Sequence, residues 1–445
     1  MAPLLRRRRR RVLLLPLPYH GHINPMLRLA AALHSRGGLA VTVVHTETRA
    51  AEARRILPPG CALVTVPDGL TPDQLAASND VPAFVTALNR NCLAPFRDIL
   101  AAALGEEEEC VVVVVADVDW YAPLAAAREM GVPALALMTS NAARFRVYLG
   151  YPRLCEKGYL PVQDLHVMVP DTARHVAYAD LLDRIVAGVR QSSGLILNTF
   201  DGIERADIEL IRRDTCIPVF PVGPLHALSP AAPAPAQLSS DHPEDRSCLE
   251  WLDTQVQGSV LFVSFGTLAT IDADELTELA WGLAGSNRPF VWVVRPRLVR
   301  GRDSVDLPCE FLKETRGRGM IVRWAPQEEV LSHPAVGVFV THCGWNSTLE
   351  SMSKGVPMIC KPCGGDQLGT ARYVGDVWKV GVRVGVNDKL REGIQVAIKT
   401  LMAGKEGEAI RNRMKEMRDV VSKCIGKGGS SDLALQELID FIDLS

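Results

Sequence analysis

The sequence lacks the long apolar run and the charge imbalance that are typical of membrane proteins and nucleic-acid-binding proteins. Its 49 Lys and Arg residues nearly balance its 51 Asp and Glu residues, and its apolar runs fall short of the roughly 18 residues that span a bilayer. The run from Arg6 to Arg11 is the local exception. We interpret it as a solvated overhang before a strand, because the apolar part behind it is short and has no cleavage site for a signal peptide. We therefore expect a cytoplasmic protein with neither a membrane nor a nucleic acid as its partner.

Cysteine is present, but its pattern predicts neither disulfides nor a zinc site. The 11 cysteines are odd in number and scattered over 445 residues, which is typical of free thiols in a reducing compartment. Cys360 and Cys363 form a CxxC pair, but no second pair or suitably spaced histidine pair follows. The chain also lacks a GxxxxGKS/T motif and a GxGxxG after its first strand, which disfavours NTP hydrolysis and the usual dinucleotide site. We predict no metal and no cofactor.

Short apolar segments alternate with longer amphipathic ones along both halves of the chain. This alternation, with continuously apolar strands, is typical of α/β proteins in which helices cover both faces of a parallel sheet. The expected strands are 12–17, 40–45, 62–66, 111–116, 134–138 and 195–198, followed by 260–264, 289–294, 320–323, 337–341 and 357–360. The expected helices of the first half are 23–35, 81–103, 121–130 and 202–213.

A segment rich in Pro, Ala and Ser separates the two halves, and the length of the chain suits two domains of about 200 residues each. We predict an N-terminal domain over 1–226, a linker over 227–240 and a C-terminal domain over 241–430. A final helix over 431–445 follows a GKGGSS break and can pack on either domain, including back on the N-terminal one. Open α/β domains bind ligands beyond the carboxyl ends of their strands, so we expect the site there.

Polar side chains concentrate in the stretch from Trp324 to Gln367, at expected turns and helix starts. An apolar strand leads there into His342, a turn at Gly344 and a helix, so free backbone amides and the positive end of the helix dipole favour a phosphate. His342 and Ser347 are candidate donors to a diphosphate, although Ser347 is also a candidate N-cap. Glu350 is either the acid of a capping box or a carboxylate that binds ribose hydroxyls.

Further polar residues flank this phosphate turn. Trp324 follows a strand, where its flat ring is suited to stack on a base. Asp366 and Gln367 close the stretch with groups suited to sugar hydroxyls, although either residue alone would more often be structural. Thr267, in the sequence SFGT at the end of another strand, marks a weaker second phosphate loop. Together these residues predict a nucleotide-sugar site.

Two histidines, His20 and His22, follow the first expected strand, and Asp117 and Asp119 follow the fourth. Because the carboxyl ends of parallel strands meet at one edge of a sheet, a histidine and an aspartate are expected to form a dyad there. A neutral imidazole at this place is suited to act as general base on an acceptor hydroxyl when its other nitrogen is oriented by a partner. The alternative for either histidine alone is helix capping or simple exposure.

The stretch from Trp324 to Gln367 closely resembles the signature box of plant secondary-product UDP-glycosyltransferases. PYHGHINPML near the start, GYLP at 158–161, the SFGT strand and RYVGDVWKVG after the box extend the resemblance over essentially the whole chain. The resemblance implies the GT-B fold, in which two Rossmann-like domains with parallel sheets face each other across a cleft. The donor is held mainly by the C-terminal domain and the acceptor by the N-terminal one.

The resemblance also implies roles for individual residues. His22 matches the catalytic base of this family, and Asp117 matches the aspartate that holds it. The donor site implied for uridine, ribose, diphosphate and sugar comprises Thr139, Thr267, Trp324, Ala325, Gln327, His342, Gly344, Trp345, Asn346, Ser347, Glu350, Asp366 and Gln367. A glutamine at the end of the box usually goes with UDP-glucose. The implied reaction is a metal-independent, inverting glucosyl transfer that gives a β-glucoside.

The acceptor is less defined, and we expect a monomer that binds one small molecule beside UDP-glucose. The sequence is similar to grass enzymes near the benzoxazinoid and cytokinin glucosyltransferases, which implies a phenolic, benzoxazinoid or cytokinin-like acceptor. The expected pocket residues are His20, Asp119, Trp120, Phe145 and Tyr148. Asp119 departs from the family pattern and either faces this pocket or competes with Asp117 for orienting His22. Lys354 and Thr370 also depart from the pattern.

Three hypotheses about function remain open from the sequence. The first is an active UDP-glucosyltransferase. The second is a catalytically silent protein that binds a UDP-sugar. The third is another two-domain α/β enzyme, such as a nucleotide-sugar epimerase or a dehydrogenase, which the missing glycine fingerprint disfavours.

Overall fold

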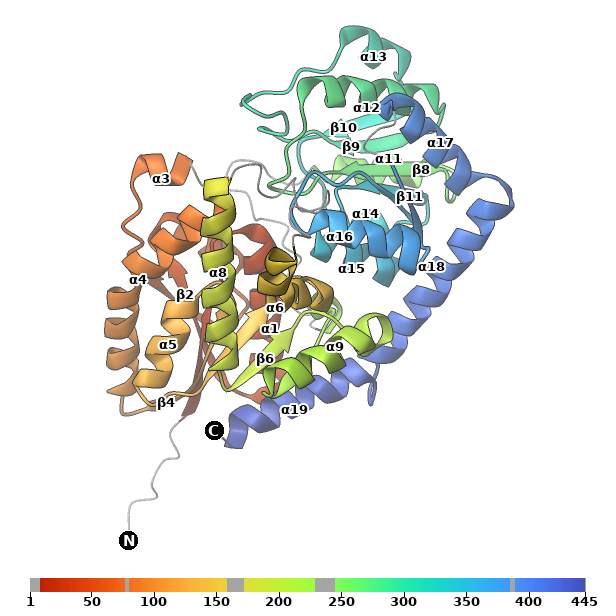
Figure 1. Cartoon of the computed structure of the whole chain (residues 1–445). Helices are drawn as coiled ribbons and strands as arrows, with labels where there is room; N and C mark the ends of the chain where they lie inside the picture. Colours follow the sequence, from red (N-terminus) through yellow and green to blue (C-terminus); the bar gives the residue numbers. More distant parts are fainter. Residues whose placement is uncertain (1–8, 77–79, 158–171, 229–244, 385–388, 445) are drawn as a thin grey trace. The chain divides into compact units, whose positions relative to one another are not determined.

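A computed structural model of the chain describes residues 9–76, 80–157, 172–228, 245–384 and 389–444 (Figure 1). The chain divides into two compact units, Met1–Pro233 with Lys423–Ser445, and Ala234–Ser422. Each unit is built on one parallel sheet, and the two sheets have seven and six strands. The α/β class predicted from the alternation is therefore confirmed. Within the described ranges, no helix combines the length and the apolar character needed to cross a membrane.

The first unit contains the sheet with the order β3-β2-β1-β4-β5-β6-β7. Its strands are β1 (Arg9–Leu15), β2 (Ala40–Thr46), β3 (Ala62–Val66), β4 (Glu109–Asp117), β5 (Ala134–Met138), β6 (Gly194–Leu197) and β7 (Val219–Pro221). Its helices are α1 (His20–Gly37), α2 (Ala50–Ile56), α3 (Pro72–Ala76), α4 (Val81–Leu104), α5 (Tyr121–Glu129), α6 (Ala142–Glu156), α8 (Thr172–Arg190), α9 (Asp201–Thr215), α10 (Leu225–Leu228) and α19 (Ser430–Leu444).

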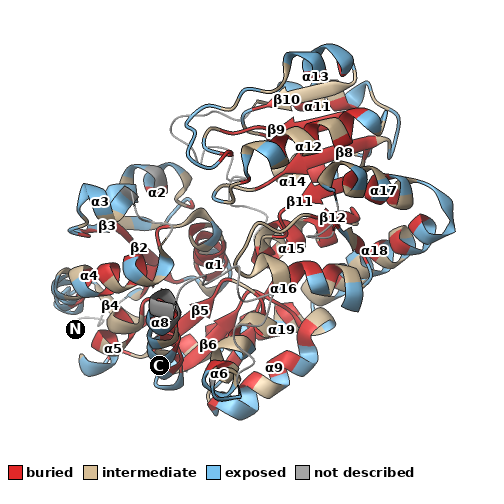
Figure 2. Cartoon of the chain, turned by 45° about the horizontal axis from the view of Figure 1, so that its top comes forward, coloured by how far each residue is buried: buried red, intermediate tan, exposed pale blue. Residues whose placement is uncertain are grey.

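Both faces of this first sheet are covered by hydrophobic cores. Successive side chains of a strand point to opposite faces, and Leu13 of β1 accordingly packs with α4, α5 and α8, whereas Leu14 packs with α1 and α19. Figure 2 shows the strands buried and the outer sides of the helices exposed. Because both faces are covered, the functional groups of this unit are confined to the strand ends and the loops that follow them.

The last helix, α19, belongs to the first unit although it ends the chain. Leu435, Leu438 and Ile442 lie in the same core cluster as α1. At its start, Ser431 Oγ donates to the carbonyl of Gly223 at 2.6 Å, and near its end Asp443 pairs with Arg10 at 2.6 Å. The sequence left open which domain this helix joins, and in the structure it completes one face of the seven-stranded sheet.

The second unit contains the sheet with the order β10-β9-β8-β11-β12-β13. Its strands are β8 (Val260–Ser264), β9 (Phe290–Val293), β10 (Gly319–Val322), β11 (Val336–Thr341), β12 (Met358–Cys360) and β13 (Gly381–Arg383). Its helices are α11 (Ser247–Asp253), α12 (Ala273–Gly285), α13 (Cys309–Glu314), α14 (Gln327–Ser332), α15 (Trp345–Lys354), α16 (Gln367–Arg372), a π-helical turn (Tyr373–Val377) and α17 (Leu390–Met402), while α18 (Gly404–Ile425) spans the boundary between the units.

The arginine run differs from its interpretation as a solvated overhang, which is wrong for Arg10 and Arg11. The strand β1 begins at Arg9 rather than at Val12. Arg10 pairs with Asp443, and Arg11 pairs with Glu106 at 2.8 Å and also with Glu109. Arg9 is exposed, and Arg6 to Arg8 lie outside the described residues.

The first two residues of the predicted linker are helical. Ala227 and Leu228, at the start of the predicted linker, belong to α10. The remainder of that linker, and the GYLP segment of the resemblance, lie outside the described residues. The ten cysteines whose side chains the structure describes are free thiols, as predicted.

Candidate functional site

The first candidate group lies where α1 follows β1. The sequence predicted that this helix begins at Ile23, but it begins at His20, so both histidines lie in its first turn rather than in a preceding loop. The His22 side chain is 28% exposed, and its Nδ1 lies 2.7 Å from Oδ2 of Asp117, the last residue of β4. The sheet thus brings together the histidine and the aspartate that the sequence analysis paired.

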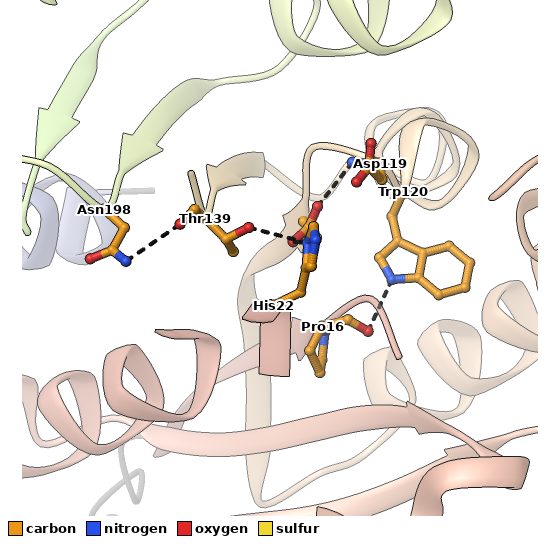
Figure 3. Close-up of polar contacts among 7 residues, drawn as sticks. Pro16, His22, Asp119, Trp120, Thr139 and Asn198 are labelled. Carbon is orange, nitrogen blue, oxygen red and sulfur yellow. Dashed lines mark hydrogen bonds and ion pairs between the residues drawn. The ribbon is translucent and has the colours of Figure 1, made fainter. Parts of the chain in front are cut away.

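Asp117 is completely buried and is held through both of its carboxylate oxygens. Oδ2 contacts His22, and Oδ1 accepts a hydrogen bond of 3.1 Å from the backbone N–H of Asp119 (Figure 3). A carboxylate only accepts hydrogen bonds, so we assign the proton of a neutral imidazole to Nδ1 of His22. Nε2 then carries the lone pair, which is the tautomer that a general base requires.

Thr139 is a second neighbour of His22. It directly follows β5, and its Oγ1 lies 3.1 Å from Nδ1 of His22 (Figure 3). Its backbone carbonyl accepts from Nδ2 of Asn198 at 3.5 Å. The resemblance implied a donor-sugar contact for Thr139, and the structure places its hydroxyl beside the histidine.

Asp119 adds a second carboxyl group to this cluster. It is 9% exposed. A ring nitrogen of His22 and one carboxyl oxygen each of Asp117 and Asp119 all lie within 4.8 Å of one another. Burial, and next the charge of Asp117, raise the pKa of Asp119 to about 7. Among the described residues, these three side chains converge closely enough to be candidate metal ligands. Both oxygens of Asp117 already accept hydrogen bonds, so the three residues form a hydrogen-bonded cluster.

The other residues predicted for the acceptor pocket differ in their exposure. Trp120 and Phe145 are buried in the hydrophobic core, and the Trp120 ring donates from Nε1 to the carbonyl of Pro16 at 3.1 Å. His20 and Tyr148 are half-buried. The carboxyl group of Asp119 belongs to the His22 cluster.

Arg144 is a charged residue near this cluster that the sequence analysis missed. Its guanidinium lies 5.1 Å from the centre of the Tyr148 ring and donates to the hydroxyl of Tyr178 at 2.6 Å. It also acts electrostatically on Asp119. Arg144 lies on α6, whose amino end is capped by Glu204 through the backbone N–H groups of Ala142 and Ala143. The sequence analysis did not expect this helix.

The second candidate group lies between β11 and α15. The strand ends at Thr341 and the helix begins at Trp345 with Gly344 as its N-cap, so the turn between them has only three residues. Cys343 in this turn has a left-handed backbone (φ 64°), and its N–H donates to Oγ1 of Thr341 at 3.1 Å. The amino end of α15 has no side-chain cap, and it presents the positive dipole end expected of a phosphate site.

The early start of α15 corrects the capping alternatives for Ser347 and Glu350. Ser347 is the third helical residue and not the N-cap, so Glu350 is not the acid of a capping box. Both side chains instead contact Gln327, whose Nε2 donates to Oγ of Ser347 at 2.9 Å and to Oε2 of Glu350 at 2.7 Å. Three residues that the resemblance assigned to the donor are thus brought into direct contact.

His342 is held neutral between two glycine loops. Its side chain is nearly fully buried, and burial lowers its pKa to about 4. A Cβ at Gly344 would lie 2.4 Å from Nε2 of His342, and a Cβ at Gly266 would lie 2.6 Å from its Cε1. Gly266 also needs its positive φ of 63°. These two glycines allow the imidazole to fit between the SFGT loop and the β11–α15 turn.

Arg295 supports the SFGT loop and was also missed by the sequence analysis. It is 5% exposed, follows β9 closely, and donates to the carbonyl of Gly266 at 2.7 Å and to that of Ala269. Burial lowers its pKa to about 10, so it remains a cation at neutral pH. Thr267 lies between the two carbonyls that Arg295 holds. An arginine directly behind an apolar strand was the available signal.

The remaining donor candidates flank this turn. Trp324 and Asn346 are half-buried and Ala325 is buried. Trp345 is also buried, and its ring centre lies 6.3 Å from that of Trp378. Asp366 precedes α16 and acts electrostatically on His342. The Gln367 side chain accepts from the backbone N–H of Cys363 at 2.8 Å.

The family model and the relatives that match this chain are all UDP-sugar transferases. The family model described as "UDP-glucoronosyl and UDP-glucosyl transferase" matches residues 166–415. The chain is 50% identical to the DIMBOA UDP-glucosyltransferase BX8 of Zea mays, over 95% of this chain and 96% of that protein. It is 48% identical to the DIMBOA UDP-glucosyltransferase BX9 of the same plant, over 98% and 96%.

Solved structures show the same likeness. The structure of Phytolacca americana UGT2 with UDP-2fluoro-glucose and pterostilbene matches with a TM-score of 0.83 and 29% identity, over 98% of this chain and 99% of that one. The structure of Os79 from O. sativa with UDP matches with a TM-score of 0.82 and 28% identity, over 97% and 100%. Both likenesses extend over the two sheets.

Proposed function

Because this chain belongs to the UDP-glycosyltransferase family, has its GT-B fold and is a glucosyltransferase, we propose an inverting transfer from UDP-glucose as its reaction. The acceptor is a hydroxyl group, or a nitrogen or carboxyl group, of a small plant metabolite, and the product is a β-glucoside. The observation that carries the proposal is the contact of 2.7 Å between Nδ1 of His22 and the buried carboxylate of Asp117. We further propose a cytoplasmic monomer that needs no cofactor.

His22 acts as the general base in this proposal. Its Nε2 lone pair takes the proton of the acceptor hydroxyl while the acceptor oxygen forms a bond to the anomeric carbon. Asp117 stabilises the imidazolium that results, because its charge is held beside Nδ1 in a buried position. General-base assistance of this kind contributes about 10²- to 10⁴-fold to the rate.

The leaving group is handled by the second unit. The bond between the anomeric carbon and the diphosphate oxygen breaks, and UDP departs with the electron pair. The amides at the amino end of α15 and the neutral ring of His342 stabilise the diphosphate charge, with Thr267 and Asn346 as further donors. In this scheme no metal ion takes part, since the backbone dipoles supply the stabilisation.

The remaining proposed contacts are with the uracil, ribose and glucose parts of UDP-glucose. Trp324 is proposed to stack on uracil, with Ala325 and Gln327 beside it, and Glu350 to bind the ribose hydroxyls. Trp345, Asp366, Gln367 and Thr139 are proposed to hold the glucose. The contact between Gln327 and Glu350 supports this proposal, because it orients the carboxylate before the donor binds.

The maize relatives suggest which acceptor to test first. Both are named as DIMBOA UDP-glucosyltransferases and are about half identical to this chain over nearly its whole length. We therefore propose DIMBOA as the first acceptor, ahead of other phenolic or cytokinin-like molecules. The proposed test incubates the protein with UDP-glucose and each acceptor, and it follows UDP release and the glucoside by mass spectrometry.

The variant His22→Ala tests the base, with His20→Ala from the same helical turn as its matched control. We expect a loss of about 10²- to 10⁴-fold in kcat for His22→Ala, a much smaller loss for His20→Ala, and unchanged affinity for UDP by calorimetry. Near-normal turnover by His22→Ala would overturn the proposed role. A wild-type protein that binds UDP but releases none from UDP-glucose with any acceptor would instead be a silent UDP-sugar-binding protein.

A further inference from the structure

The proposed reaction uses Asp117 but leaves the neighbouring carboxyl group of Asp119 without a role. The turn that carries Asp119 is well fixed. Its backbone N–H donates to Oδ1 of Asp117 at 3.1 Å, and its carbonyl accepts from Nδ2 of Asn89 at 2.8 Å. The next residue, Trp120, is anchored through its Nε1 to the carbonyl of Pro16. Asp119 is therefore held beside the dyad by at least three hydrogen bonds.

Charged and titratable groups surround Asp119 from three elements. Asp117 lies on β4. His22 lies on α1, and Tyr19 is the residue directly before that helix. Arg144 and Tyr148 lie on α6. A carboxyl oxygen of Asp119 lies within 4.8 Å of a carboxyl oxygen of Asp117. Two buried carboxyl groups this close cannot both ionise at low cost, so the pair keeps one proton until the solution is basic enough to remove it.

We propose that Asp119 is a positioning residue which shares a proton with Asp117 and thereby sets the pH at which His22 becomes a base. This inference rests on the proposed function, in which His22 is the base. While the shared proton is present, the two aspartates present one negative charge to the imidazole. When the proton leaves, they present two, and the imidazole retains its own proton to a higher pH.

The arrangement couples two ionisations near neutral pH. Burial and the Asp117 charge raise the pKa of Asp119 to about 7, whereas the positive charges of protonated His22 and of Arg144 oppose that rise. Coupled groups lose their protons in macroscopic steps that belong to the cluster rather than to one residue. The acid side of the profile of kcat/KM against pH should therefore contain two ionisations rather than one.

The variant Asp119→Asn tests this inference, because asparagine keeps the size and the backbone bond but cannot ionise. The profile of kcat/KM is measured from pH 5 to 9 for the wild type, Asp119→Asn and Asp119→Glu. For Asp119→Asn we expect a single ionisation whose midpoint lies roughly 1 pH unit lower than in the wild type. Asp119→Glu should return the midpoint toward the wild-type value. An unchanged midpoint and slope in Asp119→Asn, even with a lower kcat, would show a structural role only and overturn the inference.

A second measurement uses the wild-type protein and does not depend on the folding of a variant. The ring signals of His22 are followed by NMR in histidine-labelled protein and identified by their loss in His22→Ala. We expect two inflections with pH, and one inflection would contradict the inference. If His22→Ala keeps its turnover, the proposed function fails. If His22→Ala is inactive while the His22 signals show one inflection, only the role of Asp119 fails.

Discussion

His22 and His342 each follow a strand of a parallel sheet by a few residues, yet their surroundings give them different chemistry. His22 is 28% exposed, with a buried carboxylate at one ring nitrogen. His342 is 8% exposed, and two glycine loops surround its ring. Burial, which an imidazole tolerates better in its neutral form, lowers the pKa of His342 to about 4. In the proposed function, the same side chain serves as a proton acceptor in one unit and as a neutral hydrogen-bond donor in the other.

The two regions also differ in how they carry charge. Around His22 the charges belong to side chains, namely Asp117, Asp119 and Arg144, so protonation changes the local field. Around His342 the charges of Asp366 and Arg295 act in opposite directions on a ring that burial keeps neutral, beside the amino end of α15. We therefore expect acceptor activation to depend on pH near neutrality, and UDP binding to be nearly independent of His342 ionisation between pH 5 and 8.

The largest effect that tests this comparison is a pH dependence of stability with opposite signs in the two regions. The native pKa of Asp119 is about 7, above its ordinary value of 3.8, so the native state binds the extra proton and this stabilisation is lost as pH rises from 4 to 7. The native pKa of His342 is about 4, below its ordinary value of 6.5, so the unfolded state binds the extra proton and stability is lost as pH falls from 6.5 to 4. The contribution of Asp119 amounts to at most about 4 kcal/mol and that of His342 to at most about 3 kcal/mol.

The variants Asp119→Asn and His342→Gln measure these two contributions. Relative to the wild type, Asp119→Asn should gain stability as pH rises from 4.5 to 7, and His342→Gln should gain stability as pH falls over the same range. Calorimetric unfolding at several pH values follows the Tm of each variant against the wild type. Differences that drift in the same direction for both variants would show that the two environments are not opposite.

Much of the fold could be predicted because strand positions depend on local apolar runs. The predicted strands 62–66, 134–138 and 260–264 coincide with β3, β5 and β8. The strands β7 and β13 were missed, since each has only three residues and is defined by its partner in the sheet. The helix α6 was missed as well, because the amphipathic pattern of its sequence is weak compared with those of α1 and α4.

The site was harder to predict than the fold wherever a helix start or a charge state was involved. The helix α1 begins three residues before its predicted start, and α15 begins before Ser347, its candidate N-cap, since Tyr19 and Gly344 cap these helices without any side-chain hydrogen bond. The sequence placed Asp119 near the site, but its pKa depends on burial and on the distance to Asp117, which only the folded chain defines. Arg144 acts through tertiary contacts that no local pattern indicates, whereas the position of Arg295 directly after an apolar strand was a local signal.

A smaller effect is expected from Gly344→Ala, which tests the steric basis of the neutral histidine. The new Cβ would lie 2.4 Å from Nε2 of His342, so the ring must move from its place at the amino end of α15. Overpacking of this kind costs about 1–3 kcal/mol, which corresponds to roughly 10- to 100-fold weaker UDP binding. Calorimetry measures the affinity. The matched control is Gly369→Ala on α16, where a Cβ meets nothing within 4 Å, and equal losses in both variants would contradict the steric argument.

The smallest expected effect comes from Glu350→Gln. This variant tests whether Glu350 only binds the ribose, unlike Asp117, which is proposed to assist a catalytic histidine. Glu350 accepts from Nε2 of Gln327 at 2.7 Å, and the neutral variant should weaken both this contact and the proposed ribose contact. We expect KM for UDP-glucose to rise about 10-fold with little change in kcat, because the ribose is bound equally in the ground state and the transition state. Steady-state kinetics at several pH values measures both parameters. The matched control is Glu329→Gln on α14. It removes the same charge from an exposed ion pair with Arg246, so KM should stay unchanged. A fall in kcat with constant KM in Glu350→Gln would place Glu350 in the chemical step and remove the distinction between the two regions.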